Sequence, residues 1–144
     1  MTEQWIIPCN IGVYDVITHF KKSNRIVLKN AFSMKTGDTA YLYIASPFSE
    51  IKYECIVLND KVDDEMLKKN SYAIPPKKNN NFFIKKDKYV ELELISEFPK
   101  GTFTLLNLKE HGLGQVQIQA RVDSYLKSYI FDVKSKLVNK GGNN

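Results

Sequence analysis

The stretch that decides the fold is GDTAYLYIASPFSEIKYECIVL, residues 37–58. Alternating side chains flank the short segment ASPFS at 45–49, a pattern that predicts two long strands joined by a turn. In the first strand, 39–45, both faces carry apolar or aromatic groups, so we expect both to be covered. The second strand is expected to present on one face Ile51, Tyr53, Cys55 and Val57. We expect the turn to form a binding lip, because loops on a rigid scaffold commonly hold ligands.

Size and composition indicate one domain with a core of its own. The chain has 144 residues, 43% of them hydrophobic, and we predict a single domain over 1–133 followed by a flexible polar tail over 134–144. Lys and Arg number 21 against 16 acidic residues, and the net charge of +5 permits contact with phosphates without requiring it. No N-terminal apolar stretch is long enough for a signal peptide or a membrane span. A cytoplasmic location without membrane contact is therefore expected.

Periodicity outside the central hairpin predicts the remaining elements. Strands or extended segments are expected at 4–9, 25–28, 82–98 and 115–122. Helices are expected at 13–22, at 105–111 after a Thr104 cap, and from Asp123 to Val133. Residues 59–81 have no periodicity and should form a long surface loop. The predicted fold class is α+β, with mainly antiparallel strands curled into an open barrel and helices at its ends.

The residues that could carry catalysis do not form a recognisable constellation. His19 is expected on the solvated face of the first helix, and His111 at a helix C-terminus, where a positive charge favours the dipole. The two cysteines, Cys9 and Cys55, match neither a disulfide framework nor a metal-ligand set, and are expected to be reduced and buried. No glycine-rich loop resembles a phosphate cradle. We predict that the chain is not an enzyme and uses no cofactor or metal.

A binding function requires a less specific arrangement of residues than catalysis does. A flat base is held by aromatic faces and by hydrogen bonds to its edge, while cations hold the backbone phosphate. Residues of these kinds include Trp5, Tyr14, Tyr43, Phe48 and Tyr53 for faces, Asn10, Asn30, Ser46, Gln117 and Gln119 for hydrogen bonds, and Lys29, Lys52 and Arg121 for phosphate. Each aromatic residue has a core position as its alternative, for Trp5 and Tyr53 above all. Position favours the binding interpretation, because Asn10, Ser46 and Arg121 lie where predicted strands end.

Several motifs in order resemble a known family. They are WIIPCN at 5–10 followed by Tyr14-Asp15, GD at 37–38 followed by YLYIASP at 41–47, IKYEC at 51–55, YVELEL at 89–94, and LKEHGL at 108–113 with Gln119 and Arg121 after it. Over about residues 4–130 this ordered set resembles the EVE-like domains of the PUA-like superfamily. The sequence departs from that pattern at Leu28, where a tryptophan is usual, and at Ile11-Gly12, where Asn10 is commonly followed by proline.

The resemblance implies a PUA-like pseudobarrel whose cleft accepts a nucleobase. It implies further that the chain reads a modified base in DNA or RNA within a modification-dependent restriction or phage-defence system, either beside a nuclease on a separate subunit or in a purely reading role. The expected nucleobase pocket comprises Trp5, Asn10, Tyr14, Leu28, Asn30, Ser46, Pro47, Phe48, Tyr53 and Gln119, and the expected phosphate contacts are Lys29, Lys52 and Arg121. The alternative is a non-catalytic interaction or accessory subunit that kept the fold and lost the pocket, which Leu28 favours.

Overall fold

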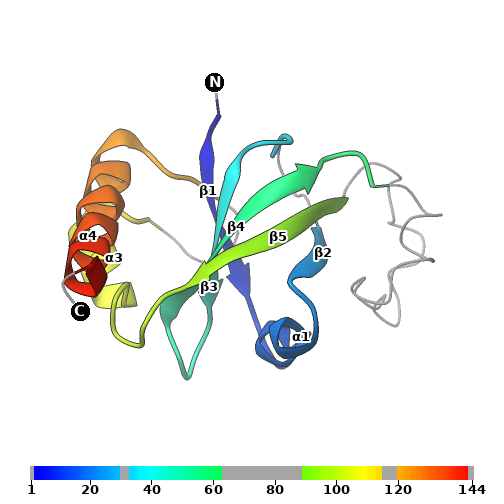
Figure 1. Ribbon diagram of the computed structural model, residues 1–144, viewed down its shortest axis with the longest axis horizontal. Coiled ribbons are helices and arrows are strands. Elements are labelled where there is room, and N and C mark those ends of the chain that lie inside the picture. The colour runs from blue at the N-terminus through cyan, green and yellow to red at the C-terminus, as the bar shows by residue number, and fades with distance from the viewer. Residues whose placement is uncertain (1, 30–32, 63–88, 115–119, 143–144) are drawn as a thin grey trace.

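Within the part of the chain that the structure describes, six strands form one curved sheet that curls into an open barrel. The computed structural model describes residues 2–29, 33–62, 89–114 and 120–142. The strands are β1 (Gln4–Cys9), β2 (Arg25–Lys29), β3 (Thr39–Ile44), β4 (Glu50–Asn59), β5 (Tyr89–Glu97) and β6 (Ala120–Arg121), and the helices are α1 (Val16–Lys22), α3 (Leu105–Glu110) and α4 (Ser124–Gly142). The strand order is β2-β5-β4-β3-β1-β6 (Figure 1). Only the β1–β3 pairing among these is parallel. The predicted α+β barrel is confirmed.

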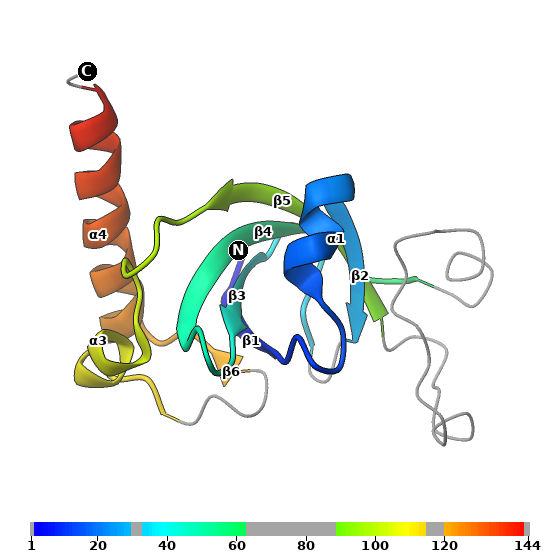
Figure 2. The ribbon, with the colours of Figure 1, turned by 90° about the horizontal axis from the view of Figure 1, so that it is seen from below.

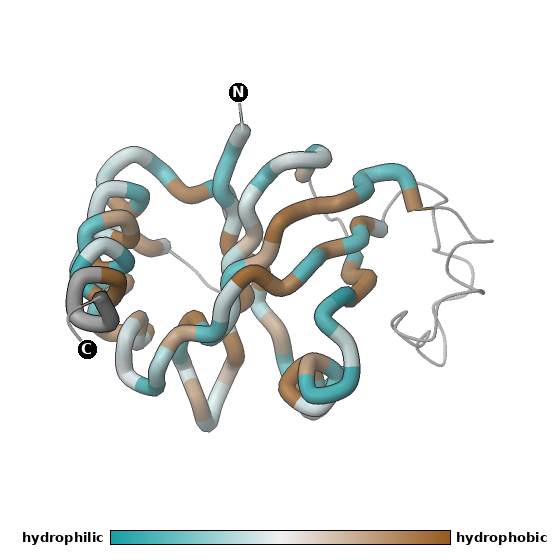
Figure 3. The backbone as a smooth tube through the Cα atoms, viewed as in Figure 1, coloured by the Kyte–Doolittle hydropathy of each residue, from teal (hydrophilic) through white to brown (hydrophobic). Residues whose placement is uncertain are grey.

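The sheet buries side chains on both of its faces. Figure 2 shows the strands curving around one core, with α1 beside β2, while α3 and α4 lie outside the curve. Inside pack the alternate residues of the strands, among them Trp5, Leu42, Tyr53 and Leu92, and outside pack Tyr41, Tyr43, Phe103, Leu126 and Ile130. Hydrophobic residues accordingly alternate with hydrophilic ones along β5 and along α4 (Figure 3). The double coverage expected for the first strand of the hairpin is confirmed.

The face predicted for Ile51 is wrong, and a β-bulge is the cause. Leu42 pairs with Tyr53, but the next residue, Tyr43, pairs with Ile51, so Lys52 is an extra residue on β4. An extra residue reverses the alternation beyond it. Tyr53, Cys55 and Val57 therefore face the inner core, as predicted, whereas Ile51 belongs to the outer one.

Capping residues determine where the helices begin. Asp15 caps α1, because its Oδ1 accepts a hydrogen bond from the Thr18 N–H at 3.1 Å, so the helix begins at Val16 rather than at the predicted Val13. The predicted caps of the other helices are confirmed: Thr104 Oγ1 accepts from Asn107 N–H at 3.2 Å, and Asp123 Oδ1 accepts from Leu126 N–H at 2.9 Å. These caps satisfy N–H groups that a helix start leaves unpaired.

The last helix is longer than the sequence pattern indicates. It continues past Val133, where a polar tail was predicted to begin, and ends at Gly142. Lys134 explains the first added turn, because its Nζ lies 3.0 Å from Glu54 Oε1 and 3.3 Å from Tyr41 Oη on the outer face of the sheet. Leu137 adds a further apolar contact with the outer core. Residues 134–142 are therefore helical.

Candidate nucleic-acid interface

The C-terminal end of β1 and the β3–β4 turn lie together at one end of the barrel. Parallel pairing places Cys9 opposite Ile44, and the Ala45 N–H donates to the Cys9 carbonyl at 2.9 Å. We call this region, residues 9–12 and 45–49, the hairpin end. The predicted proximity of Asn10 to the 45–49 turn is present in the structure.

The turn at the hairpin end is held from two sides and presents its tip to solvent. Its far side is bonded to the start of α3, where the Leu105 N–H donates to the Ser49 carbonyl at 2.9 Å. Within the turn, the Phe48 N–H donates to the Ala45 carbonyl at 3.2 Å, and the Ser46–Pro47 peptide is cis. Ser46, Pro47 and Phe48 are exposed, and the ring of Phe48 remains 39% accessible. An exposed aromatic ring on a supported turn is available to stack on a ligand.

Asn10 shapes the other half of the hairpin end. Its side chain is exposed, and its Oδ1 accepts a hydrogen bond from the Gly12 N–H at 2.8 Å. Its carbonyl accepts from the Val13 and Tyr14 N–H groups at 2.9 and 3.0 Å. An Asx turn of this kind orders the loop and leaves the amide N–H₂ group of Asn10 as the edge that can donate outward. Val13, outside the helix, is 55% exposed beside this turn.

Tyr14 is tied to a histidine that is buried, not solvated as the sequence predicted. The Tyr14 hydroxyl is hydrogen-bonded to His19 Nδ1, and His19 Nε2 lies 2.7 Å from the Arg25 carbonyl. A carbonyl can only accept, so Nε2 carries the proton and the tyrosine hydroxyl donates to Nδ1. His19 faces inward because it lies three residues after the buried Val16, on the same face of α1. Burial is the main cause that raises the pKa of Tyr14.

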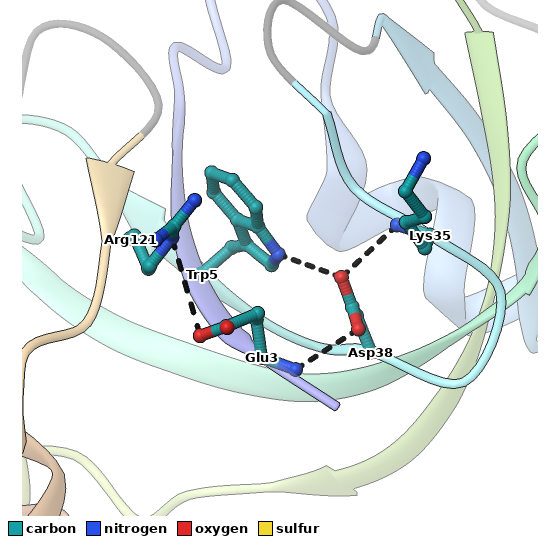
Figure 4. Close-up of polar contacts among 5 residues, drawn as sticks. All are labelled: Glu3, Trp5, Lys35, Asp38 and Arg121. Carbon is teal, nitrogen blue, oxygen red and sulfur yellow. Dashed lines mark hydrogen bonds and ion pairs between the residues drawn. The ribbon is translucent and has the colours of Figure 1, made fainter. Parts of the chain in front are cut away.

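Trp5 belongs to the inner core, and its indole N–H is engaged in a hydrogen bond within the protein. The indole ring is 4% exposed, and its Nε1–H donates to Asp38 Oδ2 at 2.9 Å (Figure 4). Asp38 also accepts from the Glu3 and Lys35 backbone N–H groups, each at 3.0 Å. The Arg121 guanidinium lies 5.4 Å from the Trp5 ring centroid, which covers the remaining face. A stacking role for Trp5 stays a prediction, and the contacts present are structural ones.

Tyr53 is also an inner-core residue. It is 2% exposed, and its ring centroid lies 4.7 Å from that of Phe20. Burial, more than the nearby charge of Glu97, raises the pKa of its hydroxyl to about 12. Burial likewise raises the pKa of Cys9 to about 12 and raises that of Cys55, so both free thiols stay protonated at neutral pH and are weak nucleophiles.

The structure does not place Leu28 and Lys29 at the hairpin end. Lys29 pairs with Tyr89 at the start of β5, which lies beside the last residues of β4. The 45–49 turn precedes the first residue of β4, so the two segments lie at opposite ends of the strands. Leu28 is buried in the inner core at 8% exposure. Asn30 and Gln119, also predicted for the pocket, lie outside the described residues, as does Gln117.

The predicted phosphate contacts are partly engaged within the protein. Lys52 Nζ lies 3.1 Å from Glu97 Oε2, and its side chain is only 18% exposed. Arg121 is more accessible, with a side chain that is 62% exposed and a loose pairing at 4.0 Å with Glu3. Lys29 is exposed at the far end of the barrel. Arg121 is therefore more available to an external phosphate than Lys52.

Sequence reasoning missed two buried carboxylates that organise the ends of the hairpin. Asp38 was interpreted only as a turn signal, although a Gly-Asp pair before a strand is also where a carboxylate can bond several N–H groups. Glu50 is 4% exposed, and its Oε1 accepts from the Gly101 N–H at 2.7 Å.

Within the described residues, no group of three His, Cys, Asp or Glu side chains is arranged to hold a metal. None of the helices described there is long and apolar enough to cross a membrane.

Comparisons with known proteins identify the fold. No protein-family model matches the sequence, and no curated protein matches it. Among solved structures, the ASCH protein of Zymomonas mobilis is similar, with a TM-score of 0.64 and 10% identity over 90% of this chain and 94% of that chain. A variant of it has a TM-score of 0.65 and 12% identity over 90% and 97%. A hypothetical protein from Leishmania major has a TM-score of 0.58 and 14% identity over 95% and 97%.

These neighbours confirm the predicted fold, whereas membership of the superfamily stays a prediction. ASCH domains belong to the PUA-like superfamily, so the architecture of this chain is that of a PUA-like barrel. Identities of 10–14% make this a likeness of fold alone. The narrower EVE-like assignment stays a prediction.

Proposed function

We propose that this chain is a non-catalytic nucleic-acid-binding module that accommodates a nucleobase at the hairpin end. The observation that carries the proposal is the exposed ring of Phe48 on a turn bonded to the end of β1, next to Asn10. The ring offers a stacking face, and the Asn10 amide and Ser46 hydroxyl offer hydrogen bonds to a base edge. The PUA-like architecture of ASCH neighbours agrees with this use of the barrel end.

The finer proposal concerns which base is bound and in what setting. We place the base outside the barrel, over Asn10, Ser46, Pro47 and Phe48, because Trp5 and Tyr53 are buried in the core. A modified base in DNA or RNA is the ligand that the EVE-like motifs favour, and a separate nuclease subunit in a restriction or phage-defence system would then be the partner. The net charge of +5 supports a polyanionic ligand.

A pair of variants tests the base site. Phe48→Ala should weaken binding to single-stranded oligonucleotides about fivefold or more, because stacking on an aromatic ring contributes about 1–3 kcal/mol per base. Ile95→Ala is the matched control, because Ile95 is also an exposed apolar residue, 55% accessible, but lies on β5. Fluorescence anisotropy with modified and unmodified DNA and RNA gives the affinities. Equal affinities for Phe48→Ala and Ile95→Ala would exclude the hairpin end as the site.

A second candidate is an accessory protein that binds another protein rather than nucleic acid. The observation that favours it is that Trp5, Leu28 and Tyr53 fill the barrel core, where a deep pocket would otherwise lie. The two functions respond differently to salt. Nucleic-acid affinity should fall steeply as salt rises, since phosphate contacts release counterions, whereas binding to a protein should change little.

A further inference from the structure

A second candidate site lies between the start of β1 and the outer side of α4. It is an open-sided hollow of about 380 Å³, which we call the α4 hollow, lined by Gln4, Lys127, Ser128, Phe131 and Asp132. Gln4 is the first residue of β1, whereas the hairpin end adjoins the last, roughly 17 Å farther along the strand. The two sites are therefore separate. Hollows of a few hundred Å³ are the size in which proteins bind small organic ligands.

Gln4 brings an unused hydrogen-bonding group to the α4 hollow. Its side-chain oxygen is shielded from solvent and has no hydrogen-bond partner among the residues that the structure describes. A buried polar atom without a partner is destabilising, because it has lost its hydrogen bonds to water. Its backbone carbonyl, in contrast, accepts from the Val122 N–H at 2.8 Å, so the residue is fixed in place between β1 and the start of α4. A ligand with an N–H donor would satisfy this oxygen once the Gln4 side chain turns its amide into the α4 hollow.

Phe131 supplies an aromatic face on the opposite side. It is 67% exposed, whereas its neighbours on α4, Leu126 and Ile130, are buried against the sheet. Lys127 stands one turn before it, and Asp132 follows it. Within the described part of the chain neither Lys127 nor Asp132 takes part in an ion pair. An aromatic face, an amide, a cation and a carboxylate thus surround one hollow.

We propose that the α4 hollow binds an adenine nucleotide, with the base on Phe131 and its edge on Gln4. The glutamine amide matches adenine, because its oxygen accepts from the exocyclic amine while its N–H₂ donates to N7. Lys127 pairs with the phosphate, and Asp132 accepts from a ribose hydroxyl, the role that acidic residues have in dinucleotide sites. Stacking on Phe131 fixes the plane of the ring. The nucleotide can be free or part of a strand, and the inference does not depend on base binding at the hairpin end.

NMR titration of the full chain tests this site directly. Adenosine monophosphate should shift the side-chain amide signals of Gln4 and the backbone signals of residues 127–132. 7-Deazaadenosine monophosphate should bind about fivefold or more weakly, because it lacks the N7 acceptor for the Gln4 N–H₂ group. Single-stranded oligoadenylate distinguishes a nucleotide within a strand from a free one. If neither adenosine monophosphate nor oligoadenylate shifts these signals at millimolar concentration, the proposal is wrong.

Variants on the same helix provide matched controls. Phe131→Ala should weaken binding of adenosine monophosphate or oligoadenylate about fivefold or more, and Gln4→Leu should abolish the preference for adenine. Val138→Ala and Lys136→Gln alter exposed residues of α4 that do not line the hollow and should change nothing. Thermal unfolding confirms that each variant is folded. Unchanged affinity in both Phe131→Ala and Gln4→Leu would overturn the proposal, and loss at Phe48→Ala alone would assign the binding to the hairpin end.

Discussion

Asp38 shows how one side chain can organise a barrel edge. It is 3% exposed and accepts from the Trp5 indole and from the Glu3 and Lys35 backbone N–H groups (Figure 4). Three donors on one carboxylate join the first residues of β1 to the turn before β3. Because each donor would be left unpaired without the carboxylate, the stability of this edge depends on Asp38 more than on the exposed residues around it.

A double-mutant cycle should measure the coupling between Trp5 and Asp38. Asp38→Ala is expected to lower the free energy of unfolding by about 3 kcal/mol, since it leaves one buried and two part-buried donors unpaired. Trp5→Phe should cost about 2 kcal/mol through the lost hydrogen bond and lost volume. The cycle with Trp5→Phe and Asp38→Asn should give a coupling of about 1 kcal/mol or more in urea denaturation. Glu110→Ala, an exposed control, should change stability by less than about 0.5 kcal/mol. Additive effects would contradict the bond seen here.

At the scale of elements, α4 is attached to the sheet by both apolar and charged contacts. Leu126 and Ile130 are buried in the outer core, and Lys134 bonds to Glu54 and Tyr41. Burial alone would lower the pKa of Lys134, but its hydrogen bonds to these two partners raise it above the ordinary value. Lys134 is therefore charged under physiological conditions and supports a helical turn that the polar sequence does not suggest.

The contribution of the Lys134 contacts to stability can be separated from the general effect of removing a positive charge from α4. Lys134→Met keeps most of the side-chain volume and removes the ammonium, and it should destabilise the protein by about 1 kcal/mol, a modest value because the group is partly exposed. Lys136→Met, exposed on the same helix, should have almost no effect. Chemical denaturation measures both. Equal stabilities of the two variants would mean that the Lys134 contacts do not hold α4.

At the scale of the whole molecule, local sequence patterns predicted the strands and helices. Pairing between distant segments decided which side chains are buried and which strand ends lie together. The alternation in β1, β3 and β5, and the Thr104 and Asp123 caps, could be predicted because each depends on neighbouring residues. The reversed face of Ile51 and the burial of His19 could not, since a bulge and a packing partner come from other segments. For the candidate site, the positions at which the predicted strands end correctly indicated that Asn10 lies near the 45–49 turn. Leu28 and Lys29 were placed with them because the strand register was unknown.

The barrel core also determines how stability should depend on pH. Cys9, with a pKa of about 12, remains protonated in the folded protein, whereas an unfolded thiol ionises near pH 8.5. Above that pH the unfolded state binds fewer protons, so the free energy of unfolding should fall, by up to about 1.4 kcal/mol per pH unit for this group. Cys9→Ala should be less stable at pH 7 but should lose stability less steeply between pH 9 and 11, by circular dichroism in urea. Equal slopes for the two proteins would contradict this.

The position of β1 has a consequence for how the chain is made. β1 leaves the ribosome before the other strands, yet it ends up between β3 and β6, and β6 is the last strand to be synthesised. Until residues 120–122 emerge, the edge of Trp5 and Ile6 that they cover has no partner. Open strand edges pair readily with other chains. Pairing of β6 with β1 is therefore a late event of biosynthesis, and nascent chains that pause before β6 leave this strand edge open.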